Sequence, residues 1–362
     1  MIILYLLYRK NFLVCKKWPV RKGRKRRAMD IVNVKQVKNY NVSQIKRALM
    51  SIPSGTKNTI SKMTGLSVAT CNTILNELEA TNEIFGIEGE KASIGRPPKV
   101  FCFNEKHSFI LCIFLTMESG IRKINYSVTD LKGNIEQEGF KECDKITTET
   151  VIILIKELIA QRPTIRTLSI GTPGYYYKKR IVSCGIEELN GIDLVGEVNA
   201  KINLPILVEN DINAIAYGMY CVRQDTYNTN GDMVAIAYYK GRGSGAGIII
   251  DGKIHHGMSS FAGEINYLQY DNTIPVEAVL AKGREGVIQV AATATQNICA
   301  ILNPEVICFT GGNISQEILD EVYLKTVEVI PREEMPQLKY FCNDTMFYVR
   351  GLYKLALENI VL

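Results

Sequence analysis

The sequence has little of several features that mark special classes of protein. Glycine (28) and proline (11) are sparse among the 362 residues, which excludes a collagen-like or low-complexity chain. The ten cysteines include no Cys-x-x-Cys pair and no cluster with histidine at metal-binding spacing, which argues against disulfides and structural zinc. Without a credible secretory signal, these thiols are expected to be reduced in a cytoplasmic protein.

Long hydrophobic runs are also lacking. The apolar run at residues 2–8 is far shorter than the ~20 residues of a membrane helix, so no membrane partner is expected. Ten basic residues follow or flank it within 1–28, on the wrong side for a secretory signal. Three interpretations stay open for residues 1–28: a basic arm that touches phosphate, a weak surface anchor, or upstream sequence translated ahead of a true start at Met29. The last is favoured, because Met29 opens a well-patterned domain.

Positive charge is concentrated near the N-terminus. The formal net charge is +6, made up of +10 in residues 1–28, +3 in 29–100 and −7 in 101–362. The bulk of the chain is therefore acidic, and a polyanionic partner must be met near the N-terminus.

Residues 39–81 show the pattern of three short helices. The first is expected over 39–50, Thr56 is expected to cap the second, and Ser67 to cap the third. A turn at Gly65 between two short helices is typical of a helix-turn-helix. The residues expected to face inward are Val42, Ile45, Ala48, Leu49, Ile60, Met63, Val68, Cys71, Ile74, Leu75 and Leu78.

Two strands, at 83–88 and 100–104, are expected to add a β wing to these helices. The third helix contains no Lys or Arg, so attraction to phosphate must come from cations around it, and dimerisation and strong salt dependence are expected. A protein-interaction module is the alternative. The predicted DNA contacts are Lys57, Lys62, Ser67, Ala69, Thr70, Asn72, Thr73, and, on the wing, Arg96 and Lys99.

From residue 108 onward strands alternate with helices. The pattern predicts two similar α/β halves that face one another across a cleft. The expected strands are 109–117, 123–130, 135–140, 167–172, 205–210, two within 233–254, and 306–310, and the expected helices include 148–161, 194–202 and 213–221.

Three groups of residues are expected at this cleft. Glu209, Asn210 and Asp211 end a strand, where a carboxylate and an amide suit vicinal hydroxyls, although Asp211 is equally suited to cap the next helix. The glycine-rich segment 241–247 frees backbone N–H groups to approach a phosphate. The third group, able to bind a polyhydroxylated ligand, consists of Glu264, Tyr267 and Glu277.

The order of four motifs resembles the ROK family, named for repressors, open reading frames and kinases. The motifs are GTPG (171–174), VENDINAIAYG (208–218), GRGSGAGIIIDGKIHHGMSSFAGEI (241–265) and FTGG (309–312). The resemblance implies an actin-like (ribonuclease H-like) two-lobed sugar-kinase fold in residues 105–362. The winged helix-turn-helix expected over 29–104 resembles that of the repressor branch.

The resemblance also assigns roles to residues. Asn210 and Asp211 match the sugar-contacting Asn and the catalytic-base Asp of the kinases, and Glu264 and Glu277 match two family glutamates. With Tyr267 these form the expected ligand site. The residues expected to retain a vestigial nucleotide site are Gly241, Gly243, Gly245, Gly311 and Gly312.

Two departures from the family pattern argue against catalysis and zinc. Residues 116–121 read TMESGI where the kinases carry an Asp-x-Gly-Gly-Thr phosphate loop, and Glu118 brings negative charge there. Tyr267 replaces the family's zinc-binding His, and no cysteine lies between Tyr267 and Glu277. No enzymatic activity, no zinc and no ATP or other cofactor are therefore expected.

These observations predict a transcriptional regulator, most simply a repressor of carbohydrate genes. Its expected partners are a double-stranded DNA operator, a sugar or sugar phosphate effector, and further copies of itself in a homodimer or homotetramer. One alternative is an ATP-dependent sugar kinase that retains a DNA-binding domain, with Asp211 as base. Another is a regulator whose cleft is vestigial and whose partner is a protein.

Overall fold

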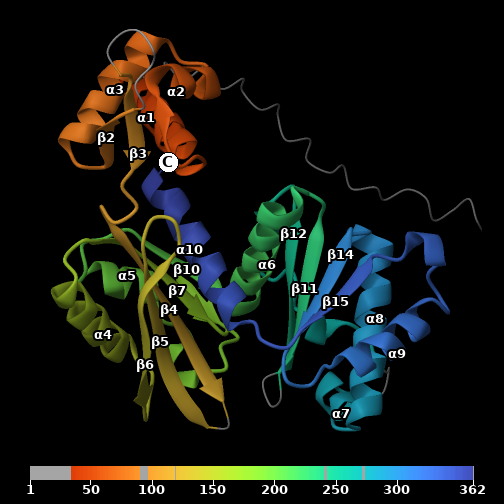
Figure 1. The fold of residues 1–362 in the computed structure, drawn as a ribbon. Helices are drawn as coiled ribbons and strands as arrows, with labels where there is room; N and C mark the ends of the chain where they lie inside the picture. Colours follow the sequence, from red (N-terminus) through yellow and green to blue (C-terminus); the bar gives the residue numbers. More distant parts are fainter. Residues whose placement is uncertain (1–33, 90–96, 119, 240–242, 271–273, 362) are drawn as a thin grey trace, which may run out of the picture. The chain divides into compact units, whose positions relative to one another are not determined.

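The computed structural model describes residues 34–89, 97–118, 120–239, 243–270 and 274–361 (Figure 1). Contacts divide the chain into two compact units, residues 1–42 and 43–362. The described part of the first unit is the start of helix α1 (Val34–Met50). The tail at 1–28, Arg96 and Gly241 lie outside the described residues, so the expectations for them stay predictions.

The N-terminal part of the second unit is a winged helix-turn-helix, as the sequence predicts. Helices α2 (Lys57–Thr64) and α3 (Val68–Ala80) follow α1. The side chains of Thr56 and Ser67 cap α2 and α3, and Gly65 takes the left-handed conformation between them, with φ of 72°. An antiparallel sheet of order β1-β3-β2 completes the module, with strands β1 (Gly55–Thr56), β2 (Ile84–Glu88) and β3 (Lys99–Phe103).

The core of this module differs from the expectation at two positions. Met63 and Val68 are 47% and 41% exposed, whereas the other expected core residues of α2 and α3 are buried. Both lie in terminal turns, at the end of α2 and the start of α3, where the turn through Gly65 leads the chain out of the packed interface. The prediction that Met63 and Val68 are buried is therefore wrong.

The rest of the chain contains two five-stranded sheets, which confirms the predicted two-lobed α/β fold. The first sheet has the order β10-β7-β4-β5-β6, with β4 (Phe109–Glu118), β5 (Ile121–Thr129), β6 (Ile135–Cys143), β7 (Ile165–Thr172) and β10 (Ile206–Asn210). The second has the order β13-β12-β11-β14-β15, with β11 (Met233–Tyr239), β12 (Gly243–Ile250), β13 (Lys253–Ile254), β14 (Val306–Thr310) and β15 (Gln337–Phe341).

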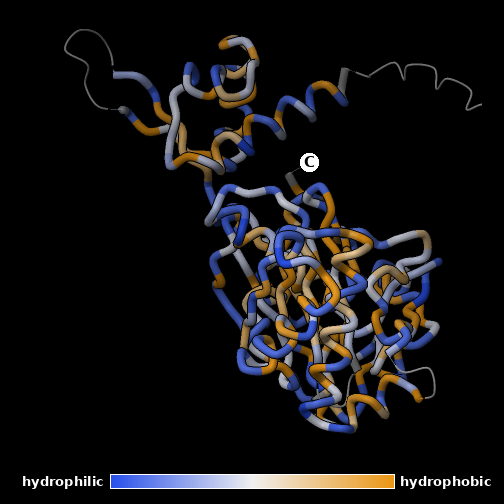
Figure 2. Tube along the Cα trace, turned by 90° about the vertical axis from the view of Figure 1, so that its right-hand side faces the viewer, coloured by the Kyte–Doolittle hydropathy of each residue, from blue (hydrophilic) through white to orange (hydrophobic). Residues whose placement is uncertain are grey.

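Helices cover both faces of these sheets, which explains the continuous apolar runs of strands such as β4. Helices α6 (Asp211–Tyr227) and α10 (Thr345–Val361) lie between the two sheets (Figure 1). The outer faces are covered by α4 (Thr148–Gln161) and α5 (Leu194–Asn199) on the first sheet, and by α8 (Arg284–Leu302) and α9 (Gln316–Thr326) on the second, with α7 (Val276–Leu280) against α8. Figure 2 shows hydrophobic stretches of the chain, in orange, running through the interior of the α/β part.

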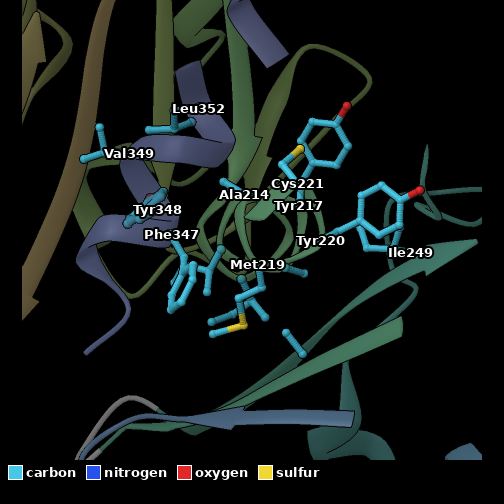
Figure 3. Close-up of a cluster of buried hydrophobic side chains, with 14 of the residues drawn as sticks. Ala214, Tyr217, Met219, Tyr220, Cys221, Ile249, Phe347, Tyr348, Val349 and Leu352 are labelled. Carbon is cyan, nitrogen blue, oxygen red and sulfur yellow. The ribbon is translucent and has the colours of Figure 1, made fainter. Parts of the chain in front are cut away.

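The central core lies where α6 meets α10 (Figure 3). Ala214 and Met219 of α6 and Phe347 and Leu352 of α10 belong to one buried cluster. Gly218 and Gly351 let the two backbones touch, since a Cβ on either glycine would collide with a backbone carbonyl of the other helix. The helices are therefore packed at close range.

Some elements were not predicted from the sequence, and others differ from their predicted length. The short hairpin β8 (Tyr175–Tyr177) and β9 (Arg180–Val182), strand β15 and three 3-10 turns, η1 (Glu187–Leu189), η2 (Ile265–Tyr267) and η3 (Arg332–Glu334), were not anticipated. Helix α5 ends at Asn199, before the expected residue 202, and α6 runs well beyond the expected 213–221.

A short connection, residues 104–108, joins β3 to β4. On one side Asn104 Nδ2 donates to the Asn82 carbonyl at 2.8 Å. On the other, the Leu131 amide donates to the Glu105 carbonyl at 3.0 Å, and Lys132 Nζ lies 2.8 Å from Glu105 Oε2. The connection is therefore hydrogen-bonded at both ends. The expected domain boundary at 104/105 stays a prediction. Among the described residues, no helix is long and apolar enough to cross a membrane.

Candidate functional site

A cavity of about 1020 Å³ is lined by residues from both α/β halves. Four of the five predicted ligand residues line it, and Tyr267 does not. Its lining also includes Met117 at the end of β4, Gly174 and Tyr175 beside the β8–β9 hairpin, and Arg284 at the start of α8. The predicted ligand residues in the lining are Asn210, Asp211, Glu264 and Glu277.

Asn210 begins helix α6 at the edge of this cavity. Its Oδ1 accepts hydrogen bonds from the backbone N–H groups of Ile212 (3.0 Å) and Asn213 (3.1 Å), so Asn210 is the helix cap. The cap is therefore Asn210 and not Asp211, although Asp211 Oδ1 also accepts a hydrogen bond from the Ile212 N–H at 2.8 Å. Asp211 lies in the first turn instead, where the positive end of the helix dipole favours its ionised form.

The carboxylate of Glu209 helps to position Asn210 through hydrogen bonds. This carboxylate is 8% exposed, and its Oε1 accepts from the Asn210 backbone N–H at 2.8 Å and from Asn213 Nδ2 at 3.0 Å. Its other oxygen, Oε2, lies 2.8 Å from His256 Nε2, which donates to it. The hydrogen bond to Glu209 raises the pKa of His256, against the opposing effect of burial. The pair links the end of β10 in the first half to the segment after β13 in the second.

His256 is a site residue that the sequence analysis did not single out. It belongs to the motif that carried the family resemblance, but its partner lies 47 residues earlier in the chain. A contact between residues so far apart in the chain leaves no periodic pattern in the sequence. The only available signal was the position of a histidine beside the glycine-rich segment.

Glu264 and Glu277 occupy different environments along the cavity. Burial raises the pKa of the Glu264 carboxyl, and no hydrogen bond to this carboxylate is found among the described residues. Burial, with Glu264 and Tyr267 nearby, raises the pKa of the Tyr175 phenol, which keeps its O–H available as a donor. Glu277 is exposed in the first turn of α7. The pair Glu264 and Tyr175 therefore offers a ligand one strong acceptor and one donor.

Tyr267 lies at the surface with 69% of its area exposed. Its ring centroid lies 5.0 Å from that of Phe261, and the Phe261 centroid lies 6.2 Å from that of Tyr175. Tyr267 is thus connected to the cavity only through other aromatic rings. The structure does not bring it together with Asn210 and Asp211 in one lining.

The expected nucleotide-site glycines have a packing role as well. Gly245 and Gly247 face α6, where a Cβ on Gly247 would meet Ala216 Cβ at 2.5 Å and the Ile212 carbonyl oxygen at 2.6 Å. Gly311 has φ of 99° and lies against the backbone of Tyr238. Gly245 and Gly312 line the cavity, whereas Gly311 is outside the lining that the structure describes. Close approach of α6 to β12 therefore explains part of the glycine pattern without a phosphate.

The charged side chains that the structure describes along the cavity are mostly acidic. They are Asp211, Glu264 and Glu277 against the single cation Arg284. Arg284 Nη2 lies 2.6 Å from Glu321 Oε1, so an acidic partner already neutralises it. The described lining thus carries a net negative charge.

The second candidate site is the outer face of α3. Ala69 and Thr73 are exposed, and Thr70 and Asn72 are partly exposed. The Thr70 hydroxyl is 2.9 Å from that of the cap residue Ser67, and the Thr73 hydroxyl donates to the Ala69 carbonyl. The face therefore presents methyl groups and the side-chain amide of Asn72, which suit contacts with base edges rather than with phosphates.

The cations around α3 fall into two groups. Lys57 and Lys62 on α2 are exposed and make no ion pair within the part of the chain that the structure describes. Lys99 Nζ lies 2.5 Å from Glu79 Oε2, and Lys46 Nζ lies 2.5 Å from Glu83 Oε2. Lys57 and Lys62 are therefore better placed to meet a phosphate than Lys99.

The described residues contain no group of three or more His, Cys, Asp or Glu side chains able to hold a metal ion. The nine described cysteines are free thiols, and burial raises the pKa of six of them, that of Cys112 to about 12.

The fold combines two α/β halves around a shared cavity with a preceding winged helix-turn-helix. This combination was compared with that of known proteins. A solved structure described as a ROK family transcriptional regulator, a homologue of the E. coli MLC protein, has the same fold, with a TM-score of 0.69 at 17% identity, over 90% of this chain and 98% of that one. A ROK family glucokinase from Streptomyces griseus gives a TM-score of 0.51 at 19% identity, over 69% of this chain and all of that one.

Residues 114–279 match the family model described as ROK family, and this chain therefore carries a ROK family domain. Among curated proteins, it is 29% identical over 252 residues to the xylose repressor of Bacillus subtilis (strain 168). That match spans 67% of this chain and 64% of the repressor. The chain thus covers less than two thirds of the length of this relative.

Proposed function

We propose that this protein is a DNA-binding transcriptional repressor whose α/β halves bind a sugar effector. The observation that carries the proposal is the presence, in one chain, of a winged helix-turn-helix and a cavity lined by Asn210, Asp211 and Glu264. Amide and carboxylate groups together suit the vicinal hydroxyls of a carbohydrate. The similarity to proteins named xylose repressor supports the same conclusion.

The effector we propose is a neutral sugar rather than a sugar phosphate. The described lining has three carboxylates, and its one guanidinium is paired with Glu321. The described carboxylates would repel a phosphate dianion, whereas a neutral sugar can donate its hydroxyl protons to Asp211 and Glu264.

We further propose that the protein does not transfer phosphate, although solved structures of similar fold include kinases. Phosphoryl transfer needs a backbone cradle and cations that neutralise the developing charge. Strand β4 includes Thr116, Met117 and Glu118 and pairs with β5 up to Glu118 and Ile121, so these residues form a strand where the kinases carry their phosphate loop. The side chain of Met117 lines the cavity beside it. The acidic lining adds to this argument.

In the proposed mechanism, two copies of the chain place their α3 helices in successive major grooves of an operator. A sugar bound between the α/β halves changes the angle between them and moves the paired winged helices out of register with the half-sites. Two modules are needed, because α3 carries no Lys or Arg and few cations surround it.

A salt-dependent DNA titration tests the DNA-binding half of the proposal. The full chain is titrated with the intergenic DNA beside its own gene and with a scrambled fragment of the same length, at several salt concentrations. We expect tighter binding to the native fragment at each salt concentration. Equal weak binding to both fragments would contradict a sequence-specific regulator and favour a protein-interaction module.

The effector half is tested on the DNA complex. A panel of neutral pentoses and hexoses, each compared with its phosphate ester, is screened for release of the native fragment. We expect release by a neutral sugar and none by its ester, and we expect Asp211→Ala to abolish the response. Formation of ADP from ATP with any sugar of the panel would contradict the non-enzymatic assignment and support the kinase alternative.

A further inference from the structure

Three aromatic rings form a continuous row from the cavity wall to the surface. Tyr175, at the start of β8, lines the cavity, and its ring meets that of Phe261 edge-on at 89°. Phe261 in turn contacts Tyr267, with ring centroids 5.0 Å apart. Exposure increases outward, to 40% for Phe261 and 69% for Tyr267. We call these three residues the aromatic row.

The row is exposed although its rings carry apolar area that packing would normally remove from water. Groups that bind hydroxyls lie beside it in the chain and in the cavity: Ser260, Glu264 and Asn266 all line the cavity. Aromatic faces next to hydrogen-bonding side chains match the chemistry of a sugar ring, which has an apolar C–H face and a polar edge. A flat protein partner would gain little from the carboxylate and amide groups inside the cavity.

The size of the cavity points in the same direction. At about 1020 Å³ it lies just above the range for pockets that hold drug-sized ligands, roughly 300–1,000 Å³. One sugar ring, with about a dozen non-hydrogen atoms, is much smaller than such a ligand. A single ring held by Asn210, Asp211 and Glu264 would leave space between itself and the row.

We propose that the aromatic row is a second sugar subsite and that the effector is a disaccharide. One ring is bound inside the cavity by Asn210, Asp211 and Glu264, and the other stacks on Phe261 and Tyr267 at the rim. This inference rests on the proposed function, because it extends the same effector site.

The test measures the binding of monosaccharides and their disaccharides to the full-length protein by titration calorimetry. The pairs are xylose and xylobiose, glucose and cellobiose, and glucose and maltose. We expect at least one disaccharide to bind about tenfold more tightly than its monosaccharide, the value of one good stacking contact. We expect Phe261→Ala and Tyr267→Ala to remove that advantage and to leave the monosaccharide affinity unchanged.

Tyr227→Ala is the matched control, since Tyr227 is 66% exposed at the end of α6 and is not a lining residue of the described cavity. Tyr267 is largely exposed, so its replacement keeps the fold intact even if Phe261→Ala does not.

Equal affinities within every pair of sugars, or a disaccharide advantage that survives Tyr267→Ala, would overturn the inference. Either result would leave the proposed effector site standing. A change from dimer to monomer in Tyr267→Ala without loss of the advantage assigns the row to self-association and also overturns it. Failure of every sugar to bind overturns the effector half of the proposed function itself.

Discussion

Gly218 of α6 and Gly351 of α10 lie face to face where the two helices cross between the sheets. A Cβ on Gly218 would collide with the Phe347 carbonyl oxygen, and a Cβ on Gly351 with the Ala214 carbonyl oxygen. The backbones touch without side chains between them. Because the N-terminal end of α6 carries the cavity residues Asn210 and Asp211, this crossing helps to position both of them.

Gly351→Ala is expected to lower the stability of the protein. Alanine gains about 1 kcal/mol over glycine in a helix interior, but overpacking against a backbone carbonyl costs about 1–3 kcal/mol or more, so the net effect is destabilising. Urea unfolding followed by circular dichroism measures the shift of the midpoint. Gly185→Ala is the control, because a Cβ there meets nothing within 4 Å. Equal midpoints for the two variants would contradict close backbone packing at the crossing.

Glu264→Gln is expected to stabilise the fold while weakening sugar binding. Burial raises the pKa of Glu264 above 4.5, so its destabilising effect on the folded state grows as the pH rises through that raised value. The variant is therefore expected to melt at a higher temperature than the parent at pH 7, with no difference below pH 4.5. Glu277→Gln, at an exposed carboxylate of the same cavity, serves as control. A lower melting temperature for Glu264→Gln at pH 7 would show that the carboxylate is favourably bonded.

The pair of His256 and Glu209 is expected to make stability depend on pH. The pKa of His256 is raised above 6.5 in the folded state, so the stabilisation is fully present below pH 6.5 and is lost as the pH rises through the raised value. We expect His256→Gln to lower the melting temperature below pH 6.5 and to approach the parent at alkaline pH. His255→Gln, at the exposed neighbouring residue, is the control. A difference that does not change with pH would contradict a charged pair.

The two groups of lysines around α3 are expected to differ in DNA binding. Lys62→Gln removes an exposed cation, so the slope of log K against log salt is expected to fall in magnitude by about 0.9, the value of one phosphate contact. Lys99→Gln is expected to change the slope by less than half of this, because its ammonium is paired with Glu79. Titrations at several salt concentrations measure both slopes. A larger change for Lys99→Gln would place the wing, not α2, against the phosphates.

Much of the fold was predictable from local signals. Thr56 and Ser67 are caps followed by apolar residues at helical spacing, and both cap a helix as expected. Apolar runs such as 109–117 identified strands buried on both faces. Where the prediction of burial failed, at Met63 and Val68, the residue lies in a terminal helix turn, whose packing depends on the neighbouring chain and not on periodicity.

The candidate site was predictable only in part. Asn210 and Asp211 were predicted because they lie where a strand ends and a helix begins, and Glu264 and Glu277 because they match two family glutamates. The partnership of His256 with Glu209 and the aromatic row of Tyr175, Phe261 and Tyr267 depend on segments that the two halves bring together. Sequence spacing contains no record of such distant contacts.

The five residues between β3 and β4 matter for the proposed response to a sugar. The hydrogen bonds of Asn104 to Asn82 and of Leu131 to Glu105 secure this connection on both sides, and Tyr353 of α10 donates to the Leu131 carbonyl at 2.9 Å. A long flexible tether would absorb any rearrangement of the sugar-binding halves. We expect the short, hydrogen-bonded connection instead to transmit a small rotation near Leu131 to the winged helix-turn-helix.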